Sequence, residues 1–222
     1  MNALRISAAA LGLVILAHGR PSQPVTQGWS AYSINDKSVP TRTDPGDVVT
    51  LPIPSPSDRI QCIAFLVKPL AGDFTGKTIS STVTLATTGA PDFRGCYDSS
   101  GCPTMPNFRL YFTTTAGPYD LKNANAHETQ YWWNTEGITI SGLALPGATG
   151  ILESSFSDPS QWSDSQGHLG SEPGYTAAFL SAVQRIQQVG FSFGGGCYWD
   201  TGVGLADLNG AATLRVASFS VQ

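Results

Sequence analysis

Apolar and polar residues alternate along several short segments of this chain, and this period of two constrains the fold more than any other feature. The apolar side chains of residues 77–85 occupy alternate positions, with threonines between them, and residues 108–112 repeat the pattern. Such alternation is typical of half-buried strands in an antiparallel sheet. The 24 glycines and 15 prolines fit short strands joined by turns. We therefore predict an all-β protein, an antiparallel β-sandwich.

Three further segments extend this prediction. Residues 60–67 form a more continuous apolar run, as expected for a central strand. In the C-terminal segment the parity of the apolar positions changes after Val216, which predicts a β-bulge near residues 217–218. Asn209-Gly210 separates residues 203–205 from that last strand, which predicts a hairpin.

One segment has a helical period instead. Apolar residues recur at three- and four-residue spacing from Phe179 to Ile186, between Pro173-Gly174 and Gly190. This is the spacing of one face of an amphipathic helix. We predict a single short helix over about residues 175–188.

The first residues have the three parts of a secretory signal. Arg5 precedes an apolar run from Ile6 to Leu16, and the small-residue site Ala17-His18-Gly19 follows. The run is shorter than the roughly 20 apolar residues that span a bilayer, although an N-terminal membrane anchor is the alternative. We expect secretion to the extracellular space or to a periplasm, with no membrane attachment after cleavage. The expected division is a signal peptide at 1–19, a short lead at 20–27 and one β-sandwich domain at 28–222.

The net charge of the chain argues against one class of partner, nucleic acids. Without the signal the net charge is −5, one unit below the −4 of the full chain, because Arg5 is removed. Nucleic-acid binding relies on Lys and Arg side chains that neutralise phosphates. We therefore expect no nucleic-acid partner, and nothing in the sequence determines the oligomeric state.

Four cysteines, an even number, fit disulfides formed in an oxidising compartment. Cys96 and Cys102 enclose five residues of turn-forming type, which can bring two Cα atoms within disulfide reach. We expect these two to be bonded, and Cys62 would then pair with Cys197, although four cysteines allow three connectivities. A zinc site needs tightly spaced Cys and His pairs, so none is predicted.

Residues 190–194 read Gly-Phe-Ser-Phe-Gly, which matches the G-x-S-x-G elbow of serine hydrolases. No helical pattern follows, and no histidine occurs after His168. We therefore predict that Ser192 is structural and faces away from its two neighbouring phenylalanines. For Gly194-Gly195-Gly196, a bulge or a tight crossing beside a tryptophan is favoured over a strand end that opens onto a ligand.

Aromatic residues next to amides and carboxylates gather in three stretches, 131–134, 162–164 and 198–200. Sugar binding needs flat aromatic faces and fixed polar groups for the hydroxyls. Alternation places Trp132 on the face opposite Trp133, so at least one tryptophan belongs to the core. We expect Trp162 and Trp199 to be exposed on loops and to stack on sugar. The candidate ligand-binding residues are Trp132, Trp133, Asn134, Trp162, Asp164, Tyr198, Trp199 and Asp200.

The order of these features resembles that of secreted bacterial β-sandwich proteins similar to jelly-roll, galactose-binding-like carbohydrate-binding modules. The resemblance covers roughly residues 28–222, and its sharp parts are the aromatic strand at 131–134 and the glycine-rich strand end at 190–196. It implies a sandwich of jelly-roll type that binds carbohydrate. The short C-terminal anchoring tail of many such proteins has no counterpart here, and no catalytic residue set is transferred.

We therefore expect a secreted, non-catalytic polysaccharide-binding protein. One alternative is a carbohydrate-active enzyme: a glycoside hydrolase with paired carboxylates, or a polysaccharide lyase with His127, Tyr131 or His168 as base beside Arg109. The other alternative is a structural or adhesive protein of an extracellular matrix.

No cofactor is expected. A structural calcium ion could be held by oxygen atoms of Asp200, Asp207 and Asn209. Asp207 and Asn209 need no metal, however, because both residue types form turns on their own.

Overall fold

The computed structural model describes residues 28–33, 37–46, 48–55, 61–96, 106–117, 128–195 and 198–222. The expected signal peptide at 1–19 and lead at 20–27 lie outside these residues. No helix within the described ranges is long and apolar enough to cross a membrane.

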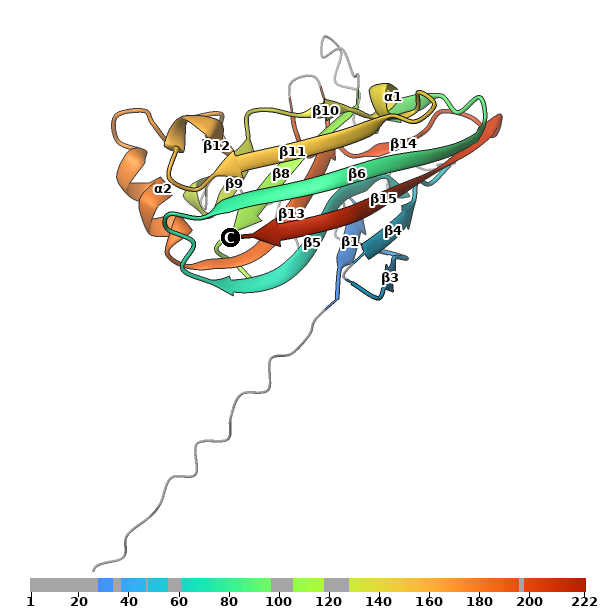
Figure 1. Ribbon diagram of the computed structural model, residues 1–222. Coiled ribbons are helices and arrows are strands. Elements are labelled where there is room, and N and C mark those ends of the chain that lie inside the picture. The colour runs from blue at the N-terminus through green and yellow to red at the C-terminus, as the bar shows by residue number, and fades with distance from the viewer. Residues whose placement is uncertain are drawn as a thin grey trace, which may run out of the picture.

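Two antiparallel sheets lie face to face, which confirms the predicted all-β sandwich (Figure 1). Along the ten-stranded sheet the order is β12 (Trp162–Asp164), β9 (Tyr131–Asn134), β8 (Asn107–Thr113), β13 (Ile186–Gly194), β5 (Ile63–Gly72), β1 (Ser30–Ser33) and β2 (Ser38–Val39). Off this path, β10 (Ile138–Thr139) pairs with β8, and β14 (Val203–Leu205) pairs with β5 and β7 (Phe93–Gly95). The five-stranded sheet has the order β11 (Thr149–Ser155), β6 (Thr78–Gly89), β15 (Gly210–Val221), β4 (Val48–Pro52) and β3 (Arg42–Asp44).

Short helical segments lie between the strands. They are η3 (Glu128–Gln130), α1 (Ile140–Leu143), η4 (Pro159–Gln161) and α2 (Thr176–Val183).

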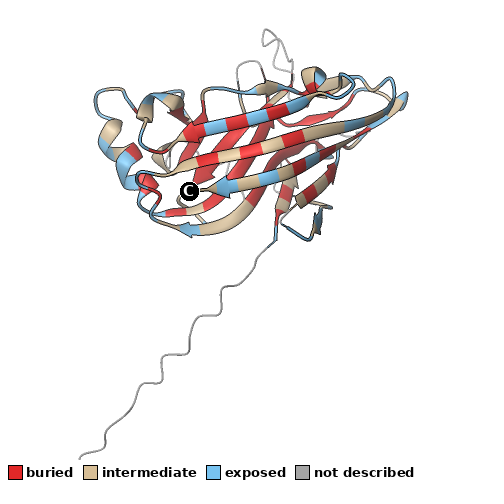
Figure 2. Cartoon of the chain, viewed as in Figure 1, coloured by how far each residue is buried: buried red, intermediate tan, exposed pale blue. Residues whose placement is uncertain are grey.

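The core fills the space between the sheets, and the alternation of the sequence decides which side chains enter it. Phe108, Leu110 and Phe112 of β8 are fully buried in this core, and so are Ile79 and Val83 of β6. Figure 2 shows the resulting bands of buried and exposed positions along the strands of the five-stranded sheet. Each strand thus buries the face that its period-two pattern predicts.

The predicted bulge in the last strand is confirmed, because the register of β15 against β6 shifts between Val216 and Ser218. The hairpin predicted at Asn209-Gly210 is wrong. β14 belongs to the ten-stranded sheet and β15 to the five-stranded sheet. Val203 of β14 is already paired on both sides, with Ile63 of β5 and Gly95 of β7, so neither edge is free for β15 at this residue.

The predicted helix exists but ends early. α2 stops at Val183, and Ile186 already begins β13 and pairs with Gly72 of β5. Ile186 is fully buried, but as a strand residue and not as part of the helix. Pairing of β13 with two neighbouring strands therefore overrides the local helical period.

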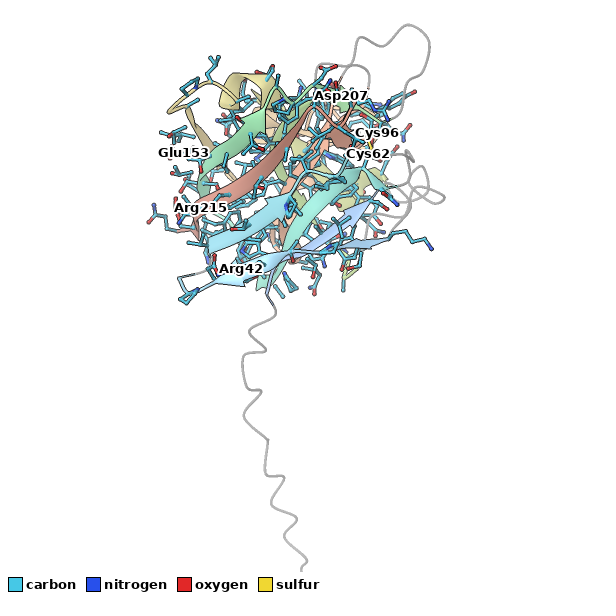
Figure 3. The ribbon with its side chains drawn as sticks, turned by 90° about the vertical axis from the view of Figure 1, so that its right-hand side faces the viewer. Arg42, Cys62, Cys96, Glu153, Asp207 and Arg215 are labelled. Atoms are coloured by element: carbon cyan, nitrogen blue, oxygen red, sulfur yellow. A yellow bond between two sulfur atoms is a disulfide. The ribbon has the colours of Figure 1, made fainter. Side chains whose placement is uncertain are left out.

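The disulfide prediction is also wrong. Cys62 is bonded to Cys96, with 6.1 Å between the Cα atoms (Figure 3). The two cysteines adjoin Ile63 and Gly95, which both pair with Val203 of β14, so the sheet brings them to one place. Cys102 and Cys197 lie outside the described residues, and the pairings Cys96–Cys102 and Cys62–Cys197 are both incompatible with the observed bond.

Candidate functional site

Aromatic side chains gather on the outer face of the ten-stranded sheet, the face turned away from the five-stranded sheet. Phe65 and Tyr111 have ring centroids 5.0 Å apart, and Tyr111 lies 5.1 Å from Trp133. Tyr131 adjoins Trp133, at 6.5 Å. We call this group, together with Ala64 and Val67, the outer-face cluster; Tyr32 and Trp199 pack against it. The members of the cluster are buried, so they offer little free aromatic surface, whereas Tyr32 and Trp199 are half-buried.

The first glycine of the hydrolase-like motif, Gly190, is required by the close packing of two strands. It lies in the middle of β13, between Val67 of β5 and Tyr111 of β8. A Cβ atom at this position would lie 2.2 Å from the carbonyl oxygen of Leu66, and φ is +156°. Only glycine therefore permits this approach of the two strands.

Ser192 follows in the same strand. Phe191 and Phe193 enter the core between the sheets, while the Ser192 hydroxyl donates to the carbonyl oxygen of Trp199 at 2.8 Å. The predicted split of the three residues between two faces is confirmed. The strand continues to Gly194 instead of turning into a helix, so the geometry of a nucleophile elbow is not formed.

The end of β13 is crossed closely by the segment that follows it. A Cβ atom at Gly194 would lie 2.5 Å from the backbone carbonyl carbon of Trp199. The N–H of Gly195 donates to the carbonyl of Tyr198, and the N–H of Gly202 donates to that of Phe193. The favoured interpretation of these glycines, a tight crossing beside a tryptophan, is confirmed at Gly194, whereas Gly196 lies outside the described residues.

Arg109 supports the indole of Trp199. Its guanidinium carbon lies 4.0 Å from the centre of the Trp199 ring, a cation–π contact. The same group donates to the carbonyl oxygens of Asn134 and Thr135 and to the side chain of Asn107, at 3.0 to 3.1 Å. Burial lowers the pKa of Arg109 to about 10, and the charge of Glu136 partly opposes this. Trp199 is therefore a half-buried ring on a fixed cationic base, not the freely exposed indole that we expected.

Asp200, next to this ring, is half-buried. Burial raises the pKa of its carboxyl to about 6, and a backbone hydrogen bond only partly opposes the effect. At neutral pH the folded protein therefore carries a carboxylate that is poorly solvated.

This raised pKa gives a stability prediction. The folded state binds the Asp200 proton more tightly than the unfolded chain does, so the stabilisation is fully present below pH 3.8 and is lost as the pH rises through about 6. We expect Asp200→Asn to raise the free energy of unfolding at pH 7.5 by about 1 to 3 kcal/mol. Urea denaturation at pH 4 and pH 7.5 measures this. An unchanged pH dependence in the variant would contradict it.

Two of the predicted tryptophans are core residues. Trp162 and Trp132 are both fully buried between the sheets, so the expectation of an exposed Trp162 is wrong. Trp162 opens β12 and pairs with Asn134 of β9. Its polar neighbours in the sequence suggested a loop, but the alternation of a short edge strand sends its ring inward. Trp133, on the opposite face, is buried in the outer-face cluster.

Asn134 is also structural. Its amide donates to Ser154 at 2.7 Å and to the carbonyl of Gln161 at 3.1 Å, and its oxygen accepts from the N–H of Glu136. These bonds join β9 to β11 and η4, so Asn134 has little hydrogen-bonding capacity left for a sugar. Tyr198, by contrast, is exposed over 55% of its surface.

Asp164, a predicted ligand-binding residue, belongs to a polar cluster that the sequence analysis did not predict. Its Oδ2 lies 3.2 Å from Nδ1 of His168, and Nε2 of His168 lies 3.2 Å from the hydroxyl of Tyr175. Desolvation, followed by the charges of Glu128, Asp164 and Glu172, raises the pKa of Tyr175. The spacing of Asp164, His168 and Tyr175 is visible in the sequence, whereas Glu128 is too distant along the chain to be found that way.

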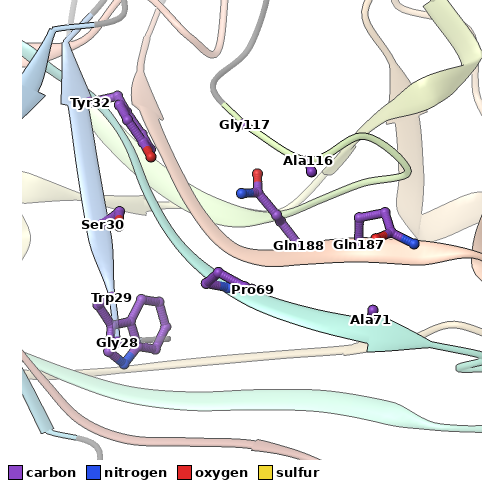
Figure 4. A pocket seen from close by; sticks show the side chains of 10 residues that line it. All are labelled: Gly28, Trp29, Ser30, Tyr32, Pro69, Ala71, Ala116, Gly117, Gln187 and Gln188. Atoms are coloured by element: carbon purple, nitrogen blue, oxygen red, sulfur yellow. The ribbon is translucent and has the colours of Figure 1, made fainter. Parts of the chain in front are cut away.

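An open pocket of about 670 Å³ lies on the outer face of the ten-stranded sheet, and we call it the outer-face pocket (Figure 4). Its lining residues are Gly28, Trp29, Ser30, Tyr32, Pro69, Ala71, Ala116, Gly117, Gln187 and Gln188. In the orientation that satisfies both of its polar atoms, the Gln188 amide donates to the carbonyl of Gly117 at 2.7 Å and accepts from the N–H of the same residue. These two bonds hold Gln188 and Gly117 together in one wall of the pocket. The sequence analysis missed the pocket because its lining residues come from distant segments of the chain.

The calcium alternative is not favoured by the turn that contains Asp207. One carboxylate oxygen of Asp207 accepts from the backbone N–H of Asn209 at 3.0 Å, and the other accepts from its side-chain amide at 2.6 Å. Both residues act as turn formers, as their types predict. Within the described ranges, the group of His, Cys, Asp and Glu side chains close enough to share a metal ion consists of Glu128, Asp164 and His168.

Comparisons of the chain with protein-family models, with curated proteins and with solved structures gave no match.

Proposed function

We propose that this chain is a secreted, non-catalytic protein that binds polysaccharide in the outer-face pocket. The observation that carries the proposal is the combination of groups around the pocket. Tyr32 contributes a half-buried aromatic ring, Gln187 an amide and Ser30 a hydroxyl. A flat apolar face beside fixed polar groups suits a sugar ring, whose C–H side stacks while its hydroxyls form hydrogen bonds.

The pocket also has capacity for such a ligand. Within the part of the chain that the structure describes, the side chains of Ser30 and Gln187 have no hydrogen-bond partner in the protein, so both can serve a ligand. The volume of about 670 Å³ lies inside the range of about 300 to 1,000 Å³ that is usual for ligand pockets. The open shape suits a chain that continues beyond the bound sugar.

Two further observations support secretion and the ligand class. Residues 1–19 have the composition of a secretory signal. The Cys62–Cys96 disulfide fits an oxidising compartment. The resemblance to carbohydrate-binding modules points to the same ligand class, although the binding residues now proposed differ from those that the sequence suggested.

Binding to a polysaccharide panel tests the proposal. We expect Tyr32→Ala to weaken the affinity for the retained polysaccharide about thirtyfold, since loss of a packed aromatic anchor typically costs about 2 kcal/mol. Gln187→Ala should weaken it less. Affinity electrophoresis in gels that contain each polysaccharide measures the effect, and thermal melting checks that the variants are folded.

Tyr198→Ala is the matched control, because this tyrosine is exposed and does not line the pocket. Undiminished retention by folded Tyr32→Ala would contradict the pocket, and loss of retention in Tyr198→Ala alone would move the site to residues 198–200. Failure of the wild type to bind any polysaccharide would favour a matrix protein instead.

A lyase is the second candidate, because one observation favours it. Tyr175, His168 and Asp164 form a hydrogen-bonded series in which a tyrosine hydroxyl contacts an imidazole that a buried carboxylate orients. Such a series is able to move a proton at a sugar carbon. Release of unsaturated products from the panel by wild type but not by Tyr175→Phe would establish the enzyme and overturn the non-catalytic proposal.

A further inference from the structure

Glu128, Asp164 and His168 are brought together from two separate segments, and none of them lines the outer-face pocket. Glu128 begins η3, Asp164 ends β12, and His168 follows in the turn before α2. We propose that these three side chains bind a divalent transition-metal ion, with zinc as the expected occupant. The proposal is independent of polysaccharide binding.

The ligand types favour zinc. Zinc is bound in proteins by His nitrogen and by Asp or Glu oxygen, and its catalytic sites combine three protein ligands with an open fourth position. Calcium and magnesium prefer sites made of oxygen atoms alone, so a histidine argues against both.

The distances fit this geometry. Oδ2 of Asp164 lies 3.2 Å from Nδ1 of His168. Two ligand atoms bonded to a tetrahedral zinc at about 2.0 to 2.1 Å are about 3.3 Å apart. One ligand atom from each residue, a carboxylate oxygen or a ring nitrogen, lies within 4.8 Å of the other two, so a shared ion requires the half-buried Glu128 side chain to approach by about 1 to 2 Å.

Asp164 is held in the orientation that a ligand needs. Its side chain is fully buried, and Oδ1 accepts the backbone N–H groups of Gln166 and His168, both at 2.9 Å. These bonds leave Oδ2 directed at the imidazole. A buried carboxylate that is fixed through one oxygen can offer the other to a metal without further ordering.

His168 is oriented in the same way. With Nδ1 on the metal, Nε2 carries the proton and lies 3.2 Å from the hydroxyl of Tyr175, whose ring also stacks on the imidazole with 4.1 Å between the ring centroids. Contacts from residues around the ligands fix the ring orientation of a metal-binding histidine. Tyr175 is therefore a positioning residue in this proposal.

The negative charge of the carboxylates around this site also favours a bound cation. Glu172 adds a third carboxylate beside Tyr175. Within the described ranges, no Lys or Arg forms a salt bridge with Glu128, Asp164 or Glu172. A bound divalent ion would compensate this concentration of negative charge.

Zinc titration of the chelator-treated full chain tests the proposal, with isothermal calorimetry for stoichiometry and cobalt absorption for coordination geometry. We expect one zinc per chain and a tetrahedral cobalt spectrum. Glu128→Gln and His168→Asn should each lower the affinity at least about tenfold, and Tyr175→Phe should lower it about tenfold by loss of orientation.

Glu172→Gln is the matched control. It removes a nearby negative charge but no proposed ligand, since Oε1 of Glu172 accepts the N–H of Leu169. Circular dichroism establishes that each variant is folded, and Glu128→Gln keeps the test decisive if His168→Asn unfolds. No zinc uptake by the wild type would overturn the proposal. Equal affinity in wild type and folded Glu128→Gln, or an effect of Glu172→Gln as large as that of Glu128→Gln, would also overturn it.

Discussion

Replacing Trp162 with alanine is expected to lower the free energy of unfolding by about 4 kcal/mol, because a large, fully buried ring is lost from the core. The ring stacks on Phe156 at 5.3 Å and meets Phe112 edge-on at 4.9 Å. Its Nε1 donates to the carbonyl of Ser155 at 2.9 Å, and truncation also removes this hydrogen bond. Urea denaturation followed by circular dichroism measures the change.

Two further variants make this prediction specific to the core. Trp162→Phe should recover much of the loss, since it restores an aromatic ring but not the hydrogen bond. Leu208→Ala removes a side chain that is 87% exposed and should change the stability by less than about 0.5 kcal/mol. A Trp162→Ala protein with wild-type stability would mean that the ring lies on the surface after all.

Removing the Cys62–Cys96 disulfide is expected to cost about 3 to 4 kcal/mol. The two cysteines are 34 residues apart in the sequence, and the chain-entropy model gives this range for a loop of that length. Both residues are buried, so the Cys62→Ala/Cys96→Ala variant avoids placing new polar groups in the interior. Denaturant unfolding of the variant and the wild type, each under non-reducing conditions, gives the difference.

Peptide mapping without reduction provides the direct control for this bond. A protease that cuts between the two cysteines should yield a linked pair of peptides that contains Cys62 and Cys96. Recovery of Cys96 linked to Cys102 would restore the connectivity that loop spacing suggested and would contradict the structure.

The sequence by itself determined the class of the fold and the facing of individual strands. In β6 and β8 the alternation of side chains identified which residues enter the core, and in β9 it placed Trp132 and Trp133 on opposite faces. In β15 a change of parity located the bulge. These features are local, because a strand directs successive side chains to opposite faces whatever it pairs with. The tight crossing at Gly194 was predictable for a related reason, since a run of glycines beside a bulky residue indicates close backbone approach.

The tertiary structure alone decided which distant segments meet. It placed β14 and β15 in different sheets, ended α2 before Ile186, and joined Cys62 to Cys96 across β14. It also buried Trp162 and assembled both the outer-face pocket and the group around His168 from separate parts of the chain. The physical reason is the same throughout. Strand pairing and burial between two sheets are free energies of contact between residues far apart in sequence, and no local pattern specifies the partner in such a contact.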